Sequence, residues 1–237
     1  MAVRHQIGVL SRVAAAFLVP DNHLGRATIS SVAVAHEVDQ MGGRSIACLN
    51  ARDRNLLGFR RDLMTAAAYG VDEFLFVFGD RPSLGARSGE LNVRSMLAEL
   101  ARFNEGTVGA GLRAGVTTRL EGVPEWKRTA SFLFVQATFD LGALLRWREA
   151  TPFEGKVYAG VLVAPSGSRA RKWATDLREV DVPGSLIDAL DKDPAAGVVF
   201  ACDMVAAIRA SGAFDGVHLI PGVRYLEVAF RLEDALR

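Results

Sequence analysis

Short apolar runs alternate along the chain with longer segments in which apolar positions recur at helical spacing. The clearest run is Phe-Leu-Phe-Val-Phe at 74–78, which ends in Gly79-Asp80-Arg81-Pro82. It is too short for a helix and lacks polar alternation, so it predicts a strand that is buried on both faces. Similar runs predict further strands, in chain order, at 13–19, 45–50, 107–112, 131–138, 157–163 and 216–220.

In the segments between these runs, apolar residues recur at the spacing of a helix. Helices are expected at 30–40, 56–69, 93–103, 141–149, 168–178, 185–190, 199–211 and 225–236. This regular βα order, with no Pro/Ser-rich linker, predicts one domain over 1–237 of the α/β class, a (βα)8 TIM-type barrel. Because a closed barrel of this type needs about eight strands and residues 1–12 resemble the end of a helix, the first strand is expected to be missing.

Composition narrows the class of protein further. The chain has 237 residues, half of them hydrophobic, which is enough for a large core. A formal net charge of +1, from 28 basic and 27 acidic residues, indicates neither a nucleic-acid partner nor a membrane partner. The first apolar run is too short to span a bilayer and no cleavage site follows it, so a cytoplasmic protein is expected. Cys48 and Cys202 stand in apolar contexts without a CxxC motif, which predicts reduced core thiols.

Polar residues follow the predicted strands and are the candidates for chemistry. In parallel α/β barrels the ligand groups lie at the carboxyl ends of the strands. The residues expected at one mouth of the barrel are Asp21, Asn22, Asn50, Arg52, Asp53, Asp80, Arg113, Gln136, Asp140 and Ser166.

Several of these residues also have a purely structural interpretation. Asp80 could meet a substrate or cap a turn, and Asp21 with Asn22 fits turn chemistry slightly better than ligand binding. Arg113 could hold a phosphate or a glutamyl carboxylate, or it could be a solvated loop arginine. His218 is better explained as a core histidine than as a ligand.

Two other classes of site are not expected. The histidines are scattered without spacing suited to a metal, and Asp53 with its flanking arginines fits an ion cluster at a helix start. The glycine-rich segment 106–115 lacks the Rossmann spacing.

The motifs, taken in order, resemble the methylenetetrahydrofolate reductase family. The segments that carry the resemblance are 20–26 (PDNHLGR), 48–55 (CLNARDRN), 78–82 (FGDRP), 134–140 (FVQATFD) and 216–219 (GVHL). The resemblance implies a (βα)8 barrel that transfers a hydride from NAD(P)H to the methylene group of 5,10-methylenetetrahydrofolate, giving 5-methyltetrahydrofolate. Most members use FAD as an intermediate carrier, and some do not.

The resemblance also implies roles for individual residues. Asp80 corresponds to the family aspartate near the flavin and folate, and Gln136 to the glutamine that hydrogen-bonds folate, so both are expected to be catalytic. Asn50 and Arg113 are expected to join Asp80 in cofactor binding. The residues expected to join Gln136 at the substrate are Asp21, Asn22 and Ser166.

The chain departs from the family pattern at several positions. No residue takes the place of the family's first-strand glutamate, which acts as an acid. Flavin contacts are replaced at Pro20, Ser45, Phe78 and 109–115, so FAD is expected to bind weakly or not at all. A phenylalanine that stacks on folate in some members is replaced by Gly167.

These departures leave two functions open. The first is a reductase that uses NAD(P)H. The alternative is a non-catalytic folate-binding paralogue, or a subunit of a one-carbon (methyl-transfer) complex. In the alternative, a second copy or a partner subunit could cover an open barrel edge.

Overall fold

The computed structural model describes residues 2–106, 111–176 and 181–236, which form two compact units. The first unit contains residues 1–117 and 124–132, and the second contains 118–123 and 133–237. Each is described by itself below, and a single domain over 1–237 stays a prediction.

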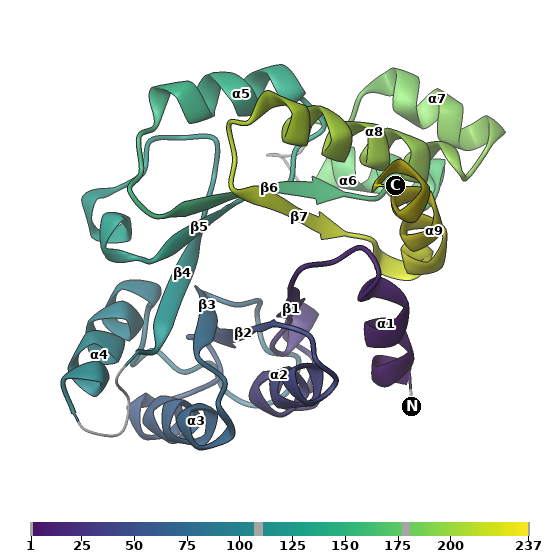
Figure 1. Cartoon of the computed structure of the whole chain (residues 1–237). Coiled ribbons are helices and arrows are strands. Elements are labelled where there is room, and N and C mark those ends of the chain that lie inside the picture. Colours follow the sequence, from purple (N-terminus) through teal and green to yellow (C-terminus); the bar gives the residue numbers. More distant parts are fainter. Residues whose placement is uncertain (1, 107–110, 177–180, 237) are drawn as a thin grey trace. The chain divides into compact units, whose positions relative to one another are not determined.

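The first unit is a parallel sheet with helices in the connections between its strands (Figure 1). Its strand order follows the chain, β1-β2-β3-β4, and each neighbouring pair is parallel. Its elements are α1 (Ala2–Leu10), β1 (Phe17–Val19), η1 (His23–Gly25), α2 (Ser31–Gln40), β2 (Ser45–Asn50), α3 (Leu56–Tyr69), β3 (Glu73–Val77), α4 (Val93–Glu105), β4 (Arg113–Thr118) and η2 (Glu125–Thr129).

The second unit continues the same alternation. β6 pairs with β7 in parallel, with Tyr158 opposite Gly216 and Leu162 opposite Ile220. Its elements are β5 (Phe132–Val135), α5 (Leu141–Ala150), β6 (Lys156–Leu162), α6 (Gly167–Asp176), α7 (Gly184–Lys192), α8 (Ala196–Ser211), β7 (Gly216–Ile220), η3 (Gly222–Arg224) and α9 (Tyr225–Leu236).

The predicted α/β class is confirmed, because the described residues contain seven parallel strands with helices between them. Several strand boundaries were wrong, including the strand expected at 131–138, which is only Phe132–Val135. The strand expected at 13–19 is only Phe17–Val19, and the one expected at 107–112 begins later, at Arg113. Residues 107–110 of that prediction, which include the start of the 109–115 segment, lie outside the described residues, as do 177–178 of the helix expected at 168–178.

The apolar runs form the core of the first unit. Every residue of β2 is buried, and Phe74 and Phe76 of β3 are fully buried. Phe76 packs edge-on against Phe59 of α3, with ring centroids 5.4 Å apart. β3 ends one residue earlier than the predicted buried run, because Phe78 leaves the strand and is 42% exposed.

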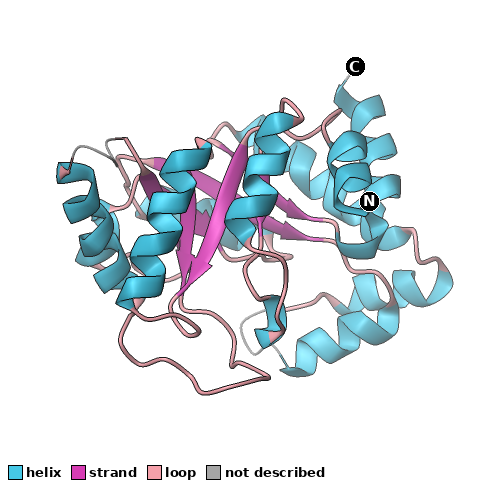
Figure 2. Ribbon diagram, turned by 90° about the horizontal axis from the view of Figure 1, so that it is seen from below, coloured by secondary structure: helices cyan, strands magenta, loops and turns pink. Residues whose placement is uncertain are grey.

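Loops connect the strands to the elements that follow them (pink in Figure 2). The expected core thiols are confirmed: Cys48 and Cys202 are free and buried, and burial raises the pKa of the Cys48 thiol. Among the helices of the described residues, none has the length and apolar character needed to cross a membrane.

Candidate functional site

The loops after β1, β2 and β3 interlock at the carboxyl edge of the first unit's sheet. Strand register brings them together: Val19 lies opposite Ala47, and Asn50 lies opposite Val77. The loop after β3 is hydrogen-bonded to the other two, from the Ser83 N–H to the Gly25 carbonyl (2.8 Å) and from the Ser88 N–H to the Arg52 carbonyl (2.7 Å). Each loop therefore restrains the next.

A buried polar cluster of Asp21, Asn50 and Arg54 anchors this edge. Asp21 Oδ2 accepts hydrogen bonds from the Asn50 backbone N–H (2.9 Å), the Asn50 Nδ2 (2.9 Å) and Arg54 Nη1 (2.7 Å). Although burial works to lower the pKa of Arg54, the carboxylates of Asp21, Asp62 and Asp53 raise it above its ordinary value. The cluster is internally satisfied, so we interpret it as the scaffold of the site.

Asn22 and Asp53 continue this network toward solvent. Asn22 adopts a left-handed conformation (φ 45°, ψ 47°). Its Oδ1 accepts from the Thr28 N–H at 3.0 Å, and its Nδ2 donates to Asp53 Oδ2 at 2.5 Å. Asn50 Nδ2 donates to the same Asp53 oxygen at 2.8 Å. These contacts give Asp21 and Asn22 partners in the turn, while Asn22 also lines the pocket described below.

Two glycines allow the loops to approach each other this closely. Gly79 has φ +88°, and a Cβ built on it would lie 2.8 Å from the Asn50 Cβ. Gly25 has φ +68°, and its Cβ would lie 1.9 Å from the Arg81 carbonyl oxygen. A side chain at either position would push the loops apart.

A small pocket of ≈ 100 Å³ opens between these loops. Two exposed carboxylates, Asp53 and Asp80, line this pocket, and Asp53 is already bonded to Asn22 and Asn50. Asp80 Oδ2 accepts a hydrogen bond from the Leu24 N–H at 2.8 Å, and its Oδ1 has no partner among the described residues. The backbone therefore fixes the orientation of Asp80 while one oxygen stays free to accept from a ligand. The residues that line the pocket are Asn22, Gly25, Ala27, Asn50, Asp53, Asp80, Pro82 and Leu84.

Arg113 was expected at a strand's carboxyl end, and this placement was wrong. It is the first residue of β4 and lies opposite Glu73, the first residue of β3. Its Nη2 lies 3.3 Å from Asp72 Oδ2 and 3.1 Å from Glu73 Oε1, and Arg44 also pairs with Glu73. Arg113 therefore belongs to an ion cluster at the amino edge of the sheet, opposite Asp80.

The remaining predicted site residues belong to the second unit. Gln136 follows β5; its backbone N–H donates to the Thr118 carbonyl at 2.8 Å, and its exposed side chain makes no hydrogen bond within the described residues. Asp140 caps α5 by accepting from the Ala143 N–H at 2.9 Å. The Ser166 hydroxyl lies 3.3 Å from the Arg169 N–H at the start of α6. Asp140 and Ser166 therefore have structural partners, and Gln136 has a free amide.

Two further positions of the second unit bear on the expected site. A Cβ at Gly167 would lie 2.0 Å from Asp191 Oδ1, so no stacking phenylalanine fits there. His218 lies on β7, edge-on to Phe134 at 5.0 Å, and burial lowers its pKa to about 4. His218 is half-buried and packs against Phe134, but within the described residues its ring has no backbone hydrogen-bond partner, so the core interpretation is supported only in part.

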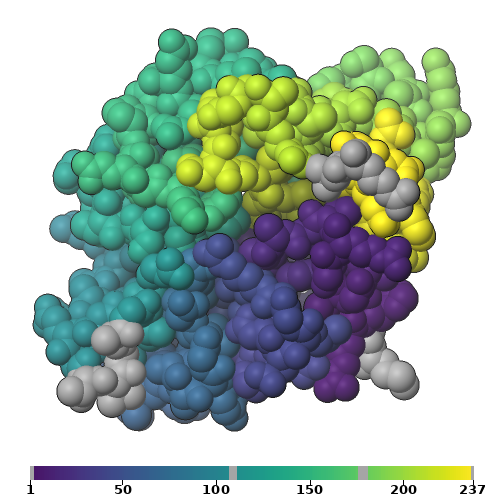
Figure 3. Space-filling model, in the orientation of Figure 1, coloured from purple at the N-terminus to yellow at the C-terminus, as the bar shows by residue number. Residues whose placement is uncertain are grey.

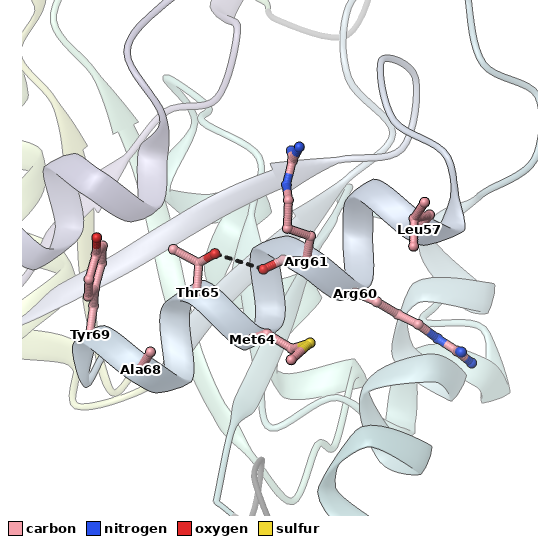
Figure 4. Close-up of a pocket in the computed structure, with 7 residues that line it drawn as sticks. All are labelled: Leu57, Arg60, Arg61, Met64, Thr65, Ala68 and Tyr69. Carbon is pink, nitrogen blue, oxygen red and sulfur yellow. Dashed lines mark hydrogen bonds between the residues drawn. The ribbon is translucent and has the colours of Figure 1, made fainter.

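A larger depression of ≈ 570 Å³ lies on the outer surface of α3. Figure 4 shows that all seven lining residues come from this one helix, from Leu57 to Tyr69, with the Thr65 hydroxyl bonded to the Arg61 carbonyl at 2.8 Å. The first unit, purple to blue in Figure 3, includes α3. The depression is apolar and carries no converging polar groups, so it lacks the features of a catalytic site.

Sequence reasoning missed two features of this edge. The first is the pairing of Arg54 with Asp21 and with Asp62 of α3, which lies 3.2 Å from its Nε; the expected ion cluster with Asp53 is present, with Arg54 Nη1 3.6 Å from Asp53 Oδ1. The second is the position of Arg52 over the exposed Phe78 ring, at 4.5 Å from the centroid, for which the sequence carried no signal. Within the described residues, no three His, Cys, Asp or Glu side chains are grouped so as to hold a metal ion.

Comparison with known proteins shows a similarity of fold. No protein-family model matches the chain, and no curated protein matches it. An uncharacterized protein from Clostridium thermocellum that binds two copies of 5-methyl-5,6,7,8-tetrahydrofolic acid is similar in structure, with a TM-score of 0.67 and 12% identity over 99% of this chain and 87% of that chain. The spore cortex-lytic enzyme SleL of Bacillus cereus gives only a TM-score of 0.43 and 11% identity, over 68% of this chain and 47% of that chain. The chain thus shares its α/β fold with the clostridial folate-binding protein.

Proposed function

We propose that this protein binds a reduced folate, with the pterin ring held at the pocket of the first unit by Asp80. The free Oδ1 of Asp80 is the observation that carries the proposal. A pterin presents neighbouring N–H donors along one edge, and a carboxylate can accept two of them in parallel. Because the Leu24 N–H holds the other oxygen, the carboxylate needs little reorganisation to receive this edge.

The apolar surroundings of Asp80 suit a flat heterocycle. Pro82 and Leu84 line the pocket, and Leu24 and Leu84 are strongly exposed in the described structure. Exposed leucines beside a polar pocket are typical of a surface that a ligand covers. The folate ligand of the structurally similar clostridial protein supports the same ligand class.

The family resemblance makes Gln136, within the second unit, a further candidate folate contact. Its amide has no hydrogen-bond partner within the described residues and can both donate and accept. It follows β5 as Asp80 follows β3, at the end where ligand groups gather in TIM-type barrels. We include that barrel class in the proposal, since the βα alternation and the folate-binding neighbour both fit it.

Calorimetry with 5-methyltetrahydrofolate tests the proposal. Asp80→Asn and Gln136→Ala should each weaken binding by about 1–3 kcal/mol, the cost of leaving a buried polar group of the ligand unpaired. Asp234→Asn, which neutralises an exposed carboxylate of α9, should bind like the wild type. No binding by the wild-type protein, or equal affinity in all variants, would contradict the proposal.

Reduction of 5,10-methylenetetrahydrofolate by NAD(P)H is the second candidate, and the motifs around Asp80 and Gln136 favour it. The residues expected to hold a cofactor do not fit a flavin. The Asn50 amide is occupied by Asp21 and Asp53, and Arg113 lies at the opposite edge. We therefore derive no step through FAD, and a reductase of this kind would take its hydride directly from the nicotinamide.

An NAD(P)H oxidation assay with methylenetetrahydrofolate separates the two candidates. Turnover above the uncatalysed rate that is lost in Asp80→Asn would establish the reductase. Folate binding without turnover would establish the non-catalytic paralogue. The assay should be run at high protein concentration, because loss of one positioned acid lowers turnover by roughly 100- to 10,000-fold.

A further inference from the structure

Two arginines stack on one exposed aromatic ring beside the pocket. The Arg52 Cζ lies 4.5 Å from the centroid of Phe78, and the Arg87 Cζ lies 5.1 Å from it. Arg52 follows β2 and Phe78 follows β3, and the strand ends Asn50 and Val77 are register partners. Phe78 directly precedes the Gly79-Asp80 turn in the chain, and the Arg52 backbone N–H donates to Oδ1 of Asn50, a residue that lines the pocket.

Neither guanidinium has a carboxylate partner in the part of the chain that the structure describes. Arg52 is the more unusual of the two, because its Nε is buried and lacks any hydrogen-bond acceptor. The nearby Asp53 carboxylate is already bonded to Asn22 and Asn50. A buried cationic N–H without an acceptor is unfavourable, and it normally indicates a missing partner.

Both guanidinium groups lie over the Phe78 ring, and because Arg52 Nε is buried, a ligand would reach Arg52 through its terminal Nη groups. A stacked guanidinium is well placed to meet a planar, two-oxygen anion, since its donors match the spacing of carboxylate oxygens. Two such groups together favour a ligand with more than one negative charge.

We propose that Arg52 and Arg87 bind the glutamyl carboxylates of the folate tail while Asp80 holds the pterin. This inference rests on the proposed function and extends it from the ring to the tail of the ligand. The tail brings two carboxylates to these two cations. The site therefore selects tailed folates over free pterins, and polyglutamates over monoglutamates.

Binding of three reduced ligands tests the inference: 6-methyltetrahydropterin, which has no tail, 5-methyltetrahydrofolate, and its triglutamate form. The wild type should bind them with affinity rising in that order. Arg87→Gln, an exposed change that should not disturb folding, and Arg52→Gln should each weaken folate binding by roughly tenfold to 100-fold, the loss expected for charge-assisted hydrogen bonds. Binding of the tail-free pterin should not change.

Arg81→Gln is the matched control, because it removes the same charge from the same loop. Arg81 is exposed and is not among the arginines that stack on Phe78. Its folate affinity should stay close to that of the wild type. If the arginines act only through the positive charge of the loop, all three variants should lose folate affinity by a similar factor. That result would overturn the inference.

Failure of the inference is distinguishable from failure of the proposed function. If the wild type binds the pterin and folate equally well, and both arginine variants match it, the tail site is refuted while pterin binding stands. If the wild type binds none of the three ligands, the proposed function and the inference both fail. A parallel titration with NADPH tests whether the two arginines bind a nucleotide phosphate instead of the folate tail. Loss of NADPH binding in the arginine variants, with folate binding intact, would show that they hold a nucleotide phosphate.

Discussion

Asp21 Oδ2 accepts hydrogen bonds from both the backbone N–H and the side-chain amide of Asn50, each at 2.9 Å, although the two residues are 29 positions apart. The pair joins the loop after β1 to the end of β2. Arg54 donates to the same carboxylate oxygen, and its guanidinium is mostly buried. Asp21 Oδ2 therefore accepts three hydrogen bonds, and the negative charge of Asp21 stabilises the arrangement of these loops.

Asp21→Asn should destabilise the protein by about 1–3 kcal/mol, the usual cost of weakening buried hydrogen bonds, because Arg54 keeps Asp62 and Asp53 as partners. Arg54 would lose the carboxylate that lies 2.7 Å from its Nη1. Chemical denaturation of the variant measures the effect. Asp80→Asn is the comparison: Asp80 is exposed, so this change should affect ligand binding and leave the free energy of unfolding within about 1 kcal/mol of the wild type. Equal stability of the two variants would refute the scaffold role of Asp21.

Gly79→Ala should destabilise the loop after β3 more than Gly85→Ala does. Both glycines have positive φ, +88° and +74°, so each alanine should carry about 1–2 kcal/mol of backbone strain. Only Gly79 also faces a neighbour, because its added Cβ would meet Asn50 at 2.8 Å, whereas the Gly85 Cβ would meet nothing within 4 Å. Thermal unfolding of both variants isolates this contact, and similar melting temperatures would contradict the close approach.

Arg113→Ala should leave reduced-folate affinity unchanged. Arg113 pairs with Asp72 and Glu73 at the amino edge of the sheet, and Arg44 continues to neutralise Glu73 in its absence. Half-exposed ion pairs of this kind contribute about 1 kcal/mol or less to stability, so the free energy of unfolding should fall only slightly. Calorimetry with 5-methyltetrahydrofolate and a denaturation curve check both statements. A marked loss of folate affinity would contradict this prediction and indicate that Arg113 contributes to ligand binding.

The sequence predicted most of the fold because the buried strands are continuous apolar runs. Phe74 and Phe76 show this most clearly, since β3 is buried on both faces from Phe74 to Phe76. The predicted strand ends were wrong where an apolar run continues from the strand into a loop. Phe78 belongs to the same apolar run but lies outside the strand, and the strand expected at 107–112 begins at Arg113.

The candidate site was predicted in part for a related reason. Residues that follow strands, such as Asp21, Asn50 and Asp80, were correctly expected at one edge, because parallel strands place their carboxyl ends together. Their individual roles depend on which hydrogen bonds they make across distant loops. Asn50 is saturated by Asp21 and Asp53, whereas Asp80 keeps a free oxygen, and no local sequence pattern distinguishes an occupied amide from an available carboxylate.

His218 should make the stability of the protein fall as the pH falls from about 6.5 toward 4. Burial lowers the pKa of His218 from 6.5 to about 4 in the folded protein, so between these values the unfolded chain binds the proton more readily. Protonation therefore favours unfolding across this window, by up to about 3 kcal/mol at its lower end. His218→Phe keeps an aromatic ring against Phe134, 5.0 Å away in the wild type, and removes the titrating group. Denaturation curves from pH 7 to 4 should show a shallower loss of stability in the variant, and the slope that remains should report the carboxylates common to both proteins. Parallel curves for the variant and the wild type would mean that His218 keeps an ordinary pKa in the folded state and that its ring is solvated.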